Sequence, residues 1–388
     1  MLVQTHDSLS NINAEEWNAL NIEDNPFLRY EFFAALEHSQ CIGDQSGWIP
    51  QYITAQDNNK LVGALPLFIK HHSYGEYIFD WAWANAYEHH GLAYYPKLVV
   101  AVPFTPVNGH RILCHPQANN VTDIQNKLIE SMLVLGRELD VSSIHCLFTT
   151  REENHVLSQH NFIERIGYQF HWENNNYSNF DHYLSQMASR HRKKIKRERQ
   201  RIREQNIQLN MLPAKDVDEN TWRRFYAFYQ STCYHKGGTP YLNFAFFKQI
   251  AKNLPDHTLL ATAHHEGQLV ATAFFMHNQR TLYGRYWGCA QEFHSLHFET
   301  CYYTPIEYCI EHQFDTLEAG AQGEHKLSRG LLPTTIHSSH WIAHPGFREA
   351  IANYLSQEKE HTLQYQSVLS EHSPFKLDLS LIDKAKTP

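Results

Sequence analysis

The hydrophobic and polar positions in the first half of the chain predict helices followed by a run of strands. Apolar residues at helical spacing mark 14–20, 27–39 and 120–140 as helices. The expected strands are 48–56, 61–70, 76–84, 142–149 and 167–174. The turn at 57–60 contains Asp57, Asn58 and Asn59 between two period-2 apolar runs, and this combination predicts a β-hairpin.

The second half repeats this order. Helices are predicted at 187–205, 217–237, 243–254, 297–313 and 346–361. Strands are predicted at 207–212, 257–265, 268–278, 281–289, 314–320 and 334–344. Gly237 and Gly238 predict a helix end, Glu266 and Gly267 predict a hairpin turn, and Pro305 predicts a kink or division in its helix. The order is mixed α/β, with an antiparallel meander extended by a crossover strand.

Two pairs of similar strings connect the halves. Residues 83–92 and 287–296 both read W-x-x-A-x-E-x-H-x-L, and 55–69 aligns without gaps on 263–277. One short insertion separates the two alignments. Such a repeat is typical of a duplicated domain whose loops have diverged. We therefore expect one domain at 1–178 and a second at 179–388.

Composition agrees with two globular domains. The chain has 388 residues, of which 42% are hydrophobic and 19% are charged, and its formal net charge is -8. The charge is uneven, because residues 190–203 hold nine Lys or Arg against one Glu. A single basic helix on an acidic protein predicts a local anion site. It argues against nucleic-acid binding over the whole surface.

Other residue classes narrow the expected location and chemistry. The chain has no apolar run long enough to span a membrane and no basic leader followed by an apolar stretch. Its seven cysteines form no C-x-x-C pair, which favours reduced thiols and a cytoplasmic location. There are 28 histidines, but neither H-E-x-x-H nor a zinc spacing occurs, so we expect no metal.

Several longer strings resemble the FemAB-like, double-GNAT group of predicted N-acyltransferases, which are relatives of the peptidoglycan aminoacyltransferases. They stand at 187–202, 234–242, 283–303 and 315–333, and the resemblance covers nearly the whole chain. It implies tandem GNAT (acyl-CoA N-acyltransferase) domains and transfer of an acyl group to an amine. It also implies a cleft where two parallel strands, here 281–289 and 314–320, separate.

The donor stays open between acyl-CoA and aminoacyl-tRNA. Ordinary GNAT enzymes hold the coenzyme A pyrophosphate on a Q/R-x-x-G-x-G/A loop at a helix N-terminus. This chain has "CAQEFHSLHF" before the corresponding helix, and its nearest glycine-bearing loop, "GAQGEHK", follows the next strand. In that loop Gly323 and Lys326 are candidate donor or substrate contacts, and Lys326 could neutralise a phosphate or carboxylate.

Candidate catalytic groups follow from the expected cleft. Backbone N–H groups at Trp287 and Gly288 could polarise the acyl carbonyl. Glu292 or His294 could accept a proton from the attacking amine, or both could simply cap the next helix. Glu88 and His90 occupy the matching positions of the first string, and we expect them to contact donor or substrate.

The remaining candidates are expected to bind substrates. Arg285 and Tyr286 belong to the strand at the expected cleft. On the basic helix, Ile195 and Ile202 mark the buried stripe, and the candidate donor-phosphate contacts are Arg192, Lys193, Lys194 and Lys196. A solvated charged face is the other interpretation of this helix.

Two functions remain possible from the residues. The first is an N-acyltransferase in which a small-molecule or peptide amine attacks the donor directly, with tRNA as a possible partner. The second is a non-catalytic double-GNAT module that recognises a cell-wall peptide or an RNA.

Overall fold

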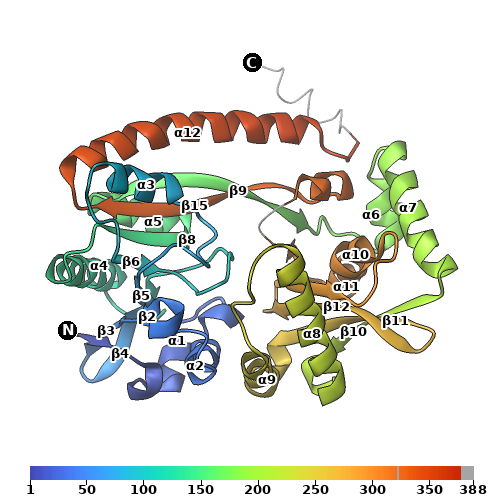
Figure 1. The fold of residues 1–388 in the computed structure, drawn as a ribbon, viewed down its shortest axis with the longest axis horizontal. Helices are drawn as coiled ribbons and strands as arrows, with labels where there is room; N and C mark the ends of the chain where they lie inside the picture. Colours follow the sequence, from blue (N-terminus) through green and yellow to red (C-terminus); the bar gives the residue numbers. More distant parts are fainter. Residues whose placement is uncertain (321–322, 377–388) are drawn as a thin grey trace.

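The computed structural model describes residues 1–320 and 323–376. In this part of the chain, eleven strands form one continuous mixed sheet in the order β10-β11-β12-β13-β14-β9-β15-β8-β6-β5-β2. Four strands, β1-β3-β4-β7, form a smaller antiparallel sheet. Helices cover both sheets, and the long helix α12 lies along one side of the molecule (Figure 1).

The elements of the first half end with β9. Its strands are β1 (Leu2–His6), β2 (Trp48–Pro50), β3 (Tyr52–Asp57), β4 (Lys60–Leu65), β5 (Leu67–Lys70), β6 (Lys97–Val100), β7 (Leu113–Cys114), β8 (Ser143–Thr149) and β9 (Ile163–Glu173). Its helices are α1 (Ala14–Ala19), α2 (Tyr30–His38), α3 (Trp81–His89), α4 (Val121–Glu138) and α5 (Arg151–Gln159).

The second half begins with α6 and follows the predicted order closely. Its helices are α6 (Phe180–Ser185), α7 (Ser189–Glu204), α8 (Glu219–His235), α9 (Phe244–Asn253), α10 (Leu296–Phe298), α11 (Thr304–Glu311) and α12 (Pro345–Glu371). Its strands are β10 (Ile207–Pro213), β11 (Thr258–His265), β12 (Gln268–His277), β13 (Thr281–Cys289), β14 (Thr316–Glu318) and β15 (Leu332–Ile342).

Each half contains a hairpin followed by two parallel strands that a helical segment connects. In the first half β3 and β4 form the hairpin, and β6 is parallel to β8. In the second half β11 and β12 form the hairpin, and β13 is parallel to β14. Both hairpin turns have positive φ at two residues, Asn58 and Asn59 in one and Glu266 and Gly267 in the other. Both predicted turns are confirmed, and Asn58, Asn59 and Gly267 are of types that tolerate positive φ.

The two halves exchange strands. Strand β9 pairs with β14, and β15 lies between β8 and β9. The first half thus completes its sheet with a strand from the second half, and the second half pairs with a strand from the first. The predicted division at residue 178 falls in the connection between β9 and α6. The large sheet nevertheless contains strands from both sides of this division.

Residues 76–84 do not form the predicted strand. The segment 71–80 is a loop, and α3 begins at Trp81, with Trp83 and Tyr87 buried four positions apart on its inner face. The strand that precedes the crossover is β6, which sequence reasoning missed. The two W-x-x-A-x-E-x-H-x-L strings therefore lie in different structures, one on a helix and the other on β13 and the loop after it.

Pro305 divides its helix as predicted. The segment Glu299–Tyr303 is a π-helical turn between α10 and α11, and Pro305 stands in the first turn of α11. Proline has no N–H to donate back along the helix, so the hydrogen-bond pattern must change around it. The wide turn carries Cys301 and Tyr302, which line the cavity described below.

Candidate functional site

The two parallel strands of the second half separate after three residue pairs. The last pair joins Tyr283 of β13 to Glu318 of β14. Strand β13 continues to Cys289 while bonded to β12 on its other side. A bulge at Arg285 interrupts that ladder, where Phe274 pairs with Tyr286 and Phe275 pairs with Gly284. The edge of β13 beyond Tyr283 is thus free of β14 at the position that the sequence predicts for a cleft.

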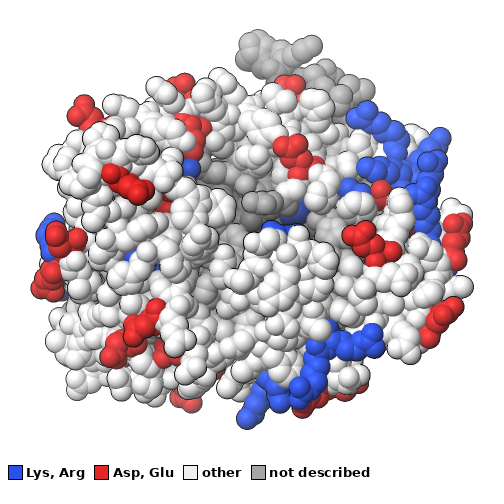
Figure 2. Space-filling view, viewed as in Figure 1, with Lys and Arg blue, Asp and Glu red and all other residues white. Residues whose placement is uncertain are grey.

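A cavity of about 490 Å³ occupies this opening. Gly284, Arg285, Tyr286 and Trp287 of β13 line it, and the surface is hollowed between the two halves (Figure 2). A cavity of this size falls in the usual range for small-molecule sites, roughly 300 to 1,000 Å³.

The walls of the cavity lie on opposite faces of the sheet. On one face, Tyr77 of the first half and Tyr229 of the second share an apolar cluster with Tyr286. On the other face, Cys301 and Tyr302 share a cluster with Trp287. His297 packs on Trp287 and His325 bonds to Tyr302, so both histidines belong to this second wall, which Lys326 adjoins. The cavity therefore connects the two faces through the gap between the strands.

The charged groups in the lining are cationic. They are Lys236, Arg285 and Lys326, and among the described residues no Asp or Glu lines the cavity. Lys326 is 2% exposed, and its Nζ donates to the carbonyl of Gly320 at 2.7 Å. Burial lowers the pKa of Lys326 to about 8. Arg285 donates to the carbonyl of Phe104 at 2.7 Å, and this bond joins the two halves.

Two histidines, His297 and His325, line the cavity on the same side as Lys326. His297 packs its ring on Trp287, with 5.2 Å between ring centroids, and burial followed by the nearby His325 and Lys236 lowers its pKa to about 4. His325 Nε2 lies 3.0 Å from the hydroxyl of Tyr302, and burial lowers the pKa of His325 as well. Both rings are therefore neutral near pH 7 and have a nitrogen lone pair available for a proton.

Glu318 is a buried carboxyl at the point where the strands part. Burial raises its pKa to about 8, although Arg285 and Arg111 oppose the shift. Its Oε2 is buried and has no hydrogen-bond partner among the described residues. The next two residues, Ala319 and Gly320, line the cavity.

The structure brings some predicted residues to this cavity. Trp287, Arg285, Tyr286 and Lys326 line it. Gly288 packs against helix α8 instead, since an added Cβ would come within 2.3 Å of the Phe228 backbone. Gly323, with φ of 116°, lies in the loop before His325, and Ala321 and Gln322 of that loop fall outside the described residues.

Glu292 and His294 lie outside the cavity lining. Both are exposed, in the loop that follows β13. A nitrogen of Arg201 on α7 lies 3.2 Å from His294 Nε2, and the histidine lines a shallow groove on that helix. The geometry brings neither side chain to the gap between the strands, so it gives their predicted proton transfer no support.

Glu88 and His90 do not have the predicted arrangement either. Glu88 is exposed on α3, and His90, also exposed, follows its last residue. The ring of His90 bonds to the carbonyl of Ala86 at 2.8 Å. Because α3 replaces the expected strand, these residues do not occupy the position that Glu292 and His294 have in the second half.

The basic segment forms helix α7. Some of its cations are paired or half-buried, and others line an open groove. Ile195 and Ile202 are buried at 0% and 2% exposure, which confirms the predicted stripe. Lys196 pairs with Asp181 at 3.1 Å, and Arg192 is half-buried. The groove on its outer face is lined by Arg190, Lys193, Lys194, Arg197, Glu198, Arg201 and His294. Figure 2 shows the basic side chains of this helix gathered at one edge of the molecule.

In 1–320 and 323–376, no group of three or more His, Cys, Asp or Glu side chains could hold a metal ion. Over the same stretches, no helix has the length and apolar character needed to cross a bilayer.

Sequence reasoning missed His297, His325, Glu318 and the loop that carries Tyr77 and Phe79. A usable signal existed for His297, since it precedes Cys301 by four positions and thus shares a helix face with it. For Tyr77 and Phe79 no local signal existed, because they reach the cavity only through contacts between the halves.

Comparison with known proteins identifies the fold and the family. FemX, a solved structure, shares 12% identity over 91% of this chain and 100% of its own, with a TM-score of 0.56. A protein of unknown function from Bacteroides thetaiotaomicron shares 12% identity over 87% of this chain and 99% of its own, with a TM-score of 0.49. A tandem GNAT protein from the clavulanic acid biosynthesis pathway shares 9% over 89% and 99%, with a TM-score of 0.45.

No curated protein matches the chain. At 12% identity the likeness to FemX speaks for the fold alone, and it agrees with the tandem GNAT arrangement predicted from the sequence. The FemAB-like family, described as peptidoglycan biosynthesis and recognition, matches residues 8–377. Because this match spans nearly all of its residues, the chain belongs to the FemAB-like family.

Proposed function

We propose that this protein is an N-acyltransferase that moves an acyl or aminoacyl group from an activated donor to an amine. The observation that carries the proposal is the cavity between β13 and β14, which connects the two faces of the sheet. Such a passage lets a donor and an acceptor enter from opposite faces and meet in line at the separated strands.

The free edge of β13 would hold the donor carbonyl. Backbone N–H groups on that edge, from Gly284 onward, no longer pair with β14. A donor carbonyl placed there would receive hydrogen bonds that strengthen as its oxygen becomes an oxyanion. Direct attack forms a C–N bond and breaks the C–S bond of a thioester or the C–O bond of an aminoacyl ester.

His297 is the proposed proton acceptor in place of His294. Its ring lines the cavity beside Trp287 and is neutral near pH 7. It could take the proton that the attacking amine loses, while the leaving thiol or hydroxyl takes one up. His325, bonded to Tyr302, could relay that proton on the same wall.

The cations favour an anionic donor. Lys326 lies in the wall with the histidines, and Lys236, which follows α8, is close enough for its charge to lower the pKa of His297. The basic face of α7 adjoins this wall, since Lys194 is among the charges that act on His325. Acyl-CoA would place phosphates on these cations, and aminoacyl-tRNA would place its backbone there. The acceptor is proposed to be the amine of an amino acid or a peptide, in keeping with the family description.

A binding and transfer screen tests this proposal. Acetyl-CoA, longer acyl-CoAs and aminoacyl-tRNA are tested by thermal shift and then incubated with a panel of labelled amino acids and peptides. We expect one donor class to raise the melting temperature and to yield an amide product. Donor binding with no product across the panel would favour the alternative, a non-catalytic module that recognises a cell-wall peptide or an RNA.

A further inference from the structure

The first half contributes the loop 71–80 to the cavity, together with Pro106. Residues 71–80 connect β5 to α3, and Tyr77 and Phe79 of this loop line the wall opposite His297. Tyr77 has a φ of 64°, so the chain reverses locally at the position where the side chain enters the cavity.

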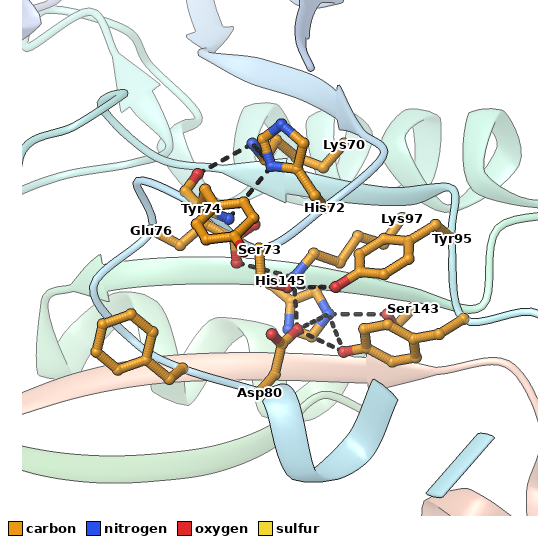
Figure 3. Close-up of polar contacts among 12 residues, drawn as sticks. Lys70, His72, Ser73, Tyr74, Glu76, Asp80, Tyr95, Lys97, Ser143 and His145 are labelled. Carbon is orange, nitrogen blue, oxygen red and sulfur yellow. Dashed lines mark hydrogen bonds and ion pairs between the residues drawn. The ribbon is translucent and has the colours of Figure 1, made fainter. Parts of the chain in front are cut away.

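The ammonium group of Lys97 holds this loop through three of its side chains. Lys97, at the start of β6, is 0% exposed. Its Nζ lies 2.7 Å from Ser73 Oγ, 2.8 Å from Glu76 Oε2 and 2.5 Å from Asp80 Oδ2. Figure 3 shows these three side chains converging on Lys97 from one side of the loop. Lys97 thus contacts the loop near its start, middle and end.

Neighbouring bonds hold the loop backbone in the same place. Trp48 Nε1 and Lys70 Nζ donate to the carbonyl of Tyr74 at 3.1 and 3.2 Å. Arg165 donates to the carbonyl of Phe79 at 2.8 Å. At Gly75 an added Cβ would come within 2.6 Å of the Phe104 ring, so the loop also packs closely there.

The loop uses different residues for anchoring and for lining the cavity. Ser73, Glu76 and Asp80 are buried against Lys97, whereas Phe79 remains 45% exposed at the cavity. Without the ammonium, two buried carboxyl groups would share a site with no cation at its centre, and the loop would have to move to hydrate them.

We infer that Lys97 is a positioning residue that fixes the loop 71–80 as the acceptor-selecting wall of the cavity. Lys97 is sealed from solvent and from substrate, so it acts only through Tyr77 and Phe79. The anionic donor is expected at Lys326 on the histidine wall, which leaves the wall of Tyr77 and Phe79 for the acceptor. Arg285, the cation beside Tyr77 and Tyr286, already donates to the carbonyl of Phe104. The inference rests on the proposed transfer function.

The test compares Lys97→Met, Ser73→Ala and Phe79→Ala with wild type and with Lys248→Met, an exposed lysine on α9. Hydrogen exchange measures loop order without any substrate. Amides in 71–80 should exchange at least tenfold faster in Lys97→Met and less so in Ser73→Ala, with β11 to β13 unchanged. Wild-type exchange of the loop in Lys97→Met would overturn the inference.

Kinetics with acetyl-CoA and the best amine of the panel separate selection from a general structural effect. Acceptor KM should rise at least tenfold in Lys97→Met and Phe79→Ala, while donor KM stays within twofold. The double variant should be no worse than the worse single variant, because both changes remove the same wall. Equal effects on both KM values, or additive effects, would contradict the inference.

Failure of the proposed function and failure of this inference give different results. If wild type transfers nothing to any amine, the proposed function fails and acceptor selection fails with it, while hydrogen exchange still decides whether Lys97 holds the loop. If Lys97→Met does not fold, Ser73→Ala and Phe79→Ala decide, since neither leaves a buried charge unpaired. Unchanged acceptor KM in both would then overturn the inference.

Discussion

At the scale of single residues, three positions separate two histidines with different environments. His294 is exposed beside Arg201, whereas His297 lines the cavity between the separated strands. The sequence places both near a helix start, but His294 lies in the loop before the helix and His297 lies in α10. Ser295 between them has a φ of 72°, a left-handed turn that a serine does not indicate in the sequence.

Replacing His297 with Gln should slow transfer without weakening donor binding. Removing a general base typically costs about 10²- to 10⁴-fold in rate. Turnover and the donor Kd are measured for His297→Gln and for the control His294→Gln. We expect kcat to fall at least a hundredfold in the first and to change less than twofold in the second. A reversed pattern would restore His294 as the base.

The charge on Lys326 should make donor binding depend on pH. Its pKa is about 8 in the folded protein, so the ammonium is present below that value and is lost above it. Affinity for coenzyme A should therefore fall as pH rises from 7 to 9, measured by calorimetry. The Lys326→Met variant should bind coenzyme A more weakly at pH 7, and its affinity should no longer fall between pH 7 and 9. The Lys248→Met variant should keep both the wild-type affinity and its pH dependence.

At the scale of elements, sequence periodicity predicted the helices and strands whose own residues define which face is buried. Helix α7 is an example, because Ile195 and Ile202, seven positions apart, mark its buried side. The predicted strand at 76–84 was wrong. Glu76 and Asp80 flank the apolar run 77–79, and both carboxylates bond to Lys97, a contact with a different strand that no local pattern contains.

The outer face of α7 provides a test of the donor class. The triple change Lys193→Gln, Lys194→Gln and Arg197→Gln removes cations of the groove, whereas Lys196→Gln removes one that already pairs with Asp181. If tRNA is the donor, the triple variant should bind it more weakly with a shallower salt dependence. Coenzyme A binding should change much less, and Lys196→Gln should change neither.

At the scale of the whole molecule, strand exchange makes the halves interdependent. Strand β15 completes the first half, and β9 pairs with β14 of the second. The sequence predicted two consecutive domains, since each half repeats the same order of elements. It could not show which half each last strand joins, because that choice depends on pairing between residues far apart in the chain.

The exchange predicts that neither half folds alone. A polypeptide of residues 1–178 lacks β15 and would expose the edge of β8, and one of 179–388 would leave β14 unpaired on one side. Each is produced separately and studied by circular dichroism and thermal melting. We expect no cooperative transition from either alone, and a cooperative transition from the full chain. Two independently folded halves would contradict the exchange.

The central claim is that transfer takes place in the gap between β13 and β14. Gly284 lines this gap, where an added Cβ would lie 3.5 Å from the Glu318 carbonyl and 3.2 Å from the Phe275 ring. A valine there suits the strand backbone but fills the opening. The most direct test measures transfer by Gly284→Val against Gly346→Val, a glycine at the start of α12. The account predicts a loss of at least a hundredfold in the first, with an unchanged melting profile, and near wild-type transfer in the second. Full transfer by a folded Gly284→Val protein would contradict it.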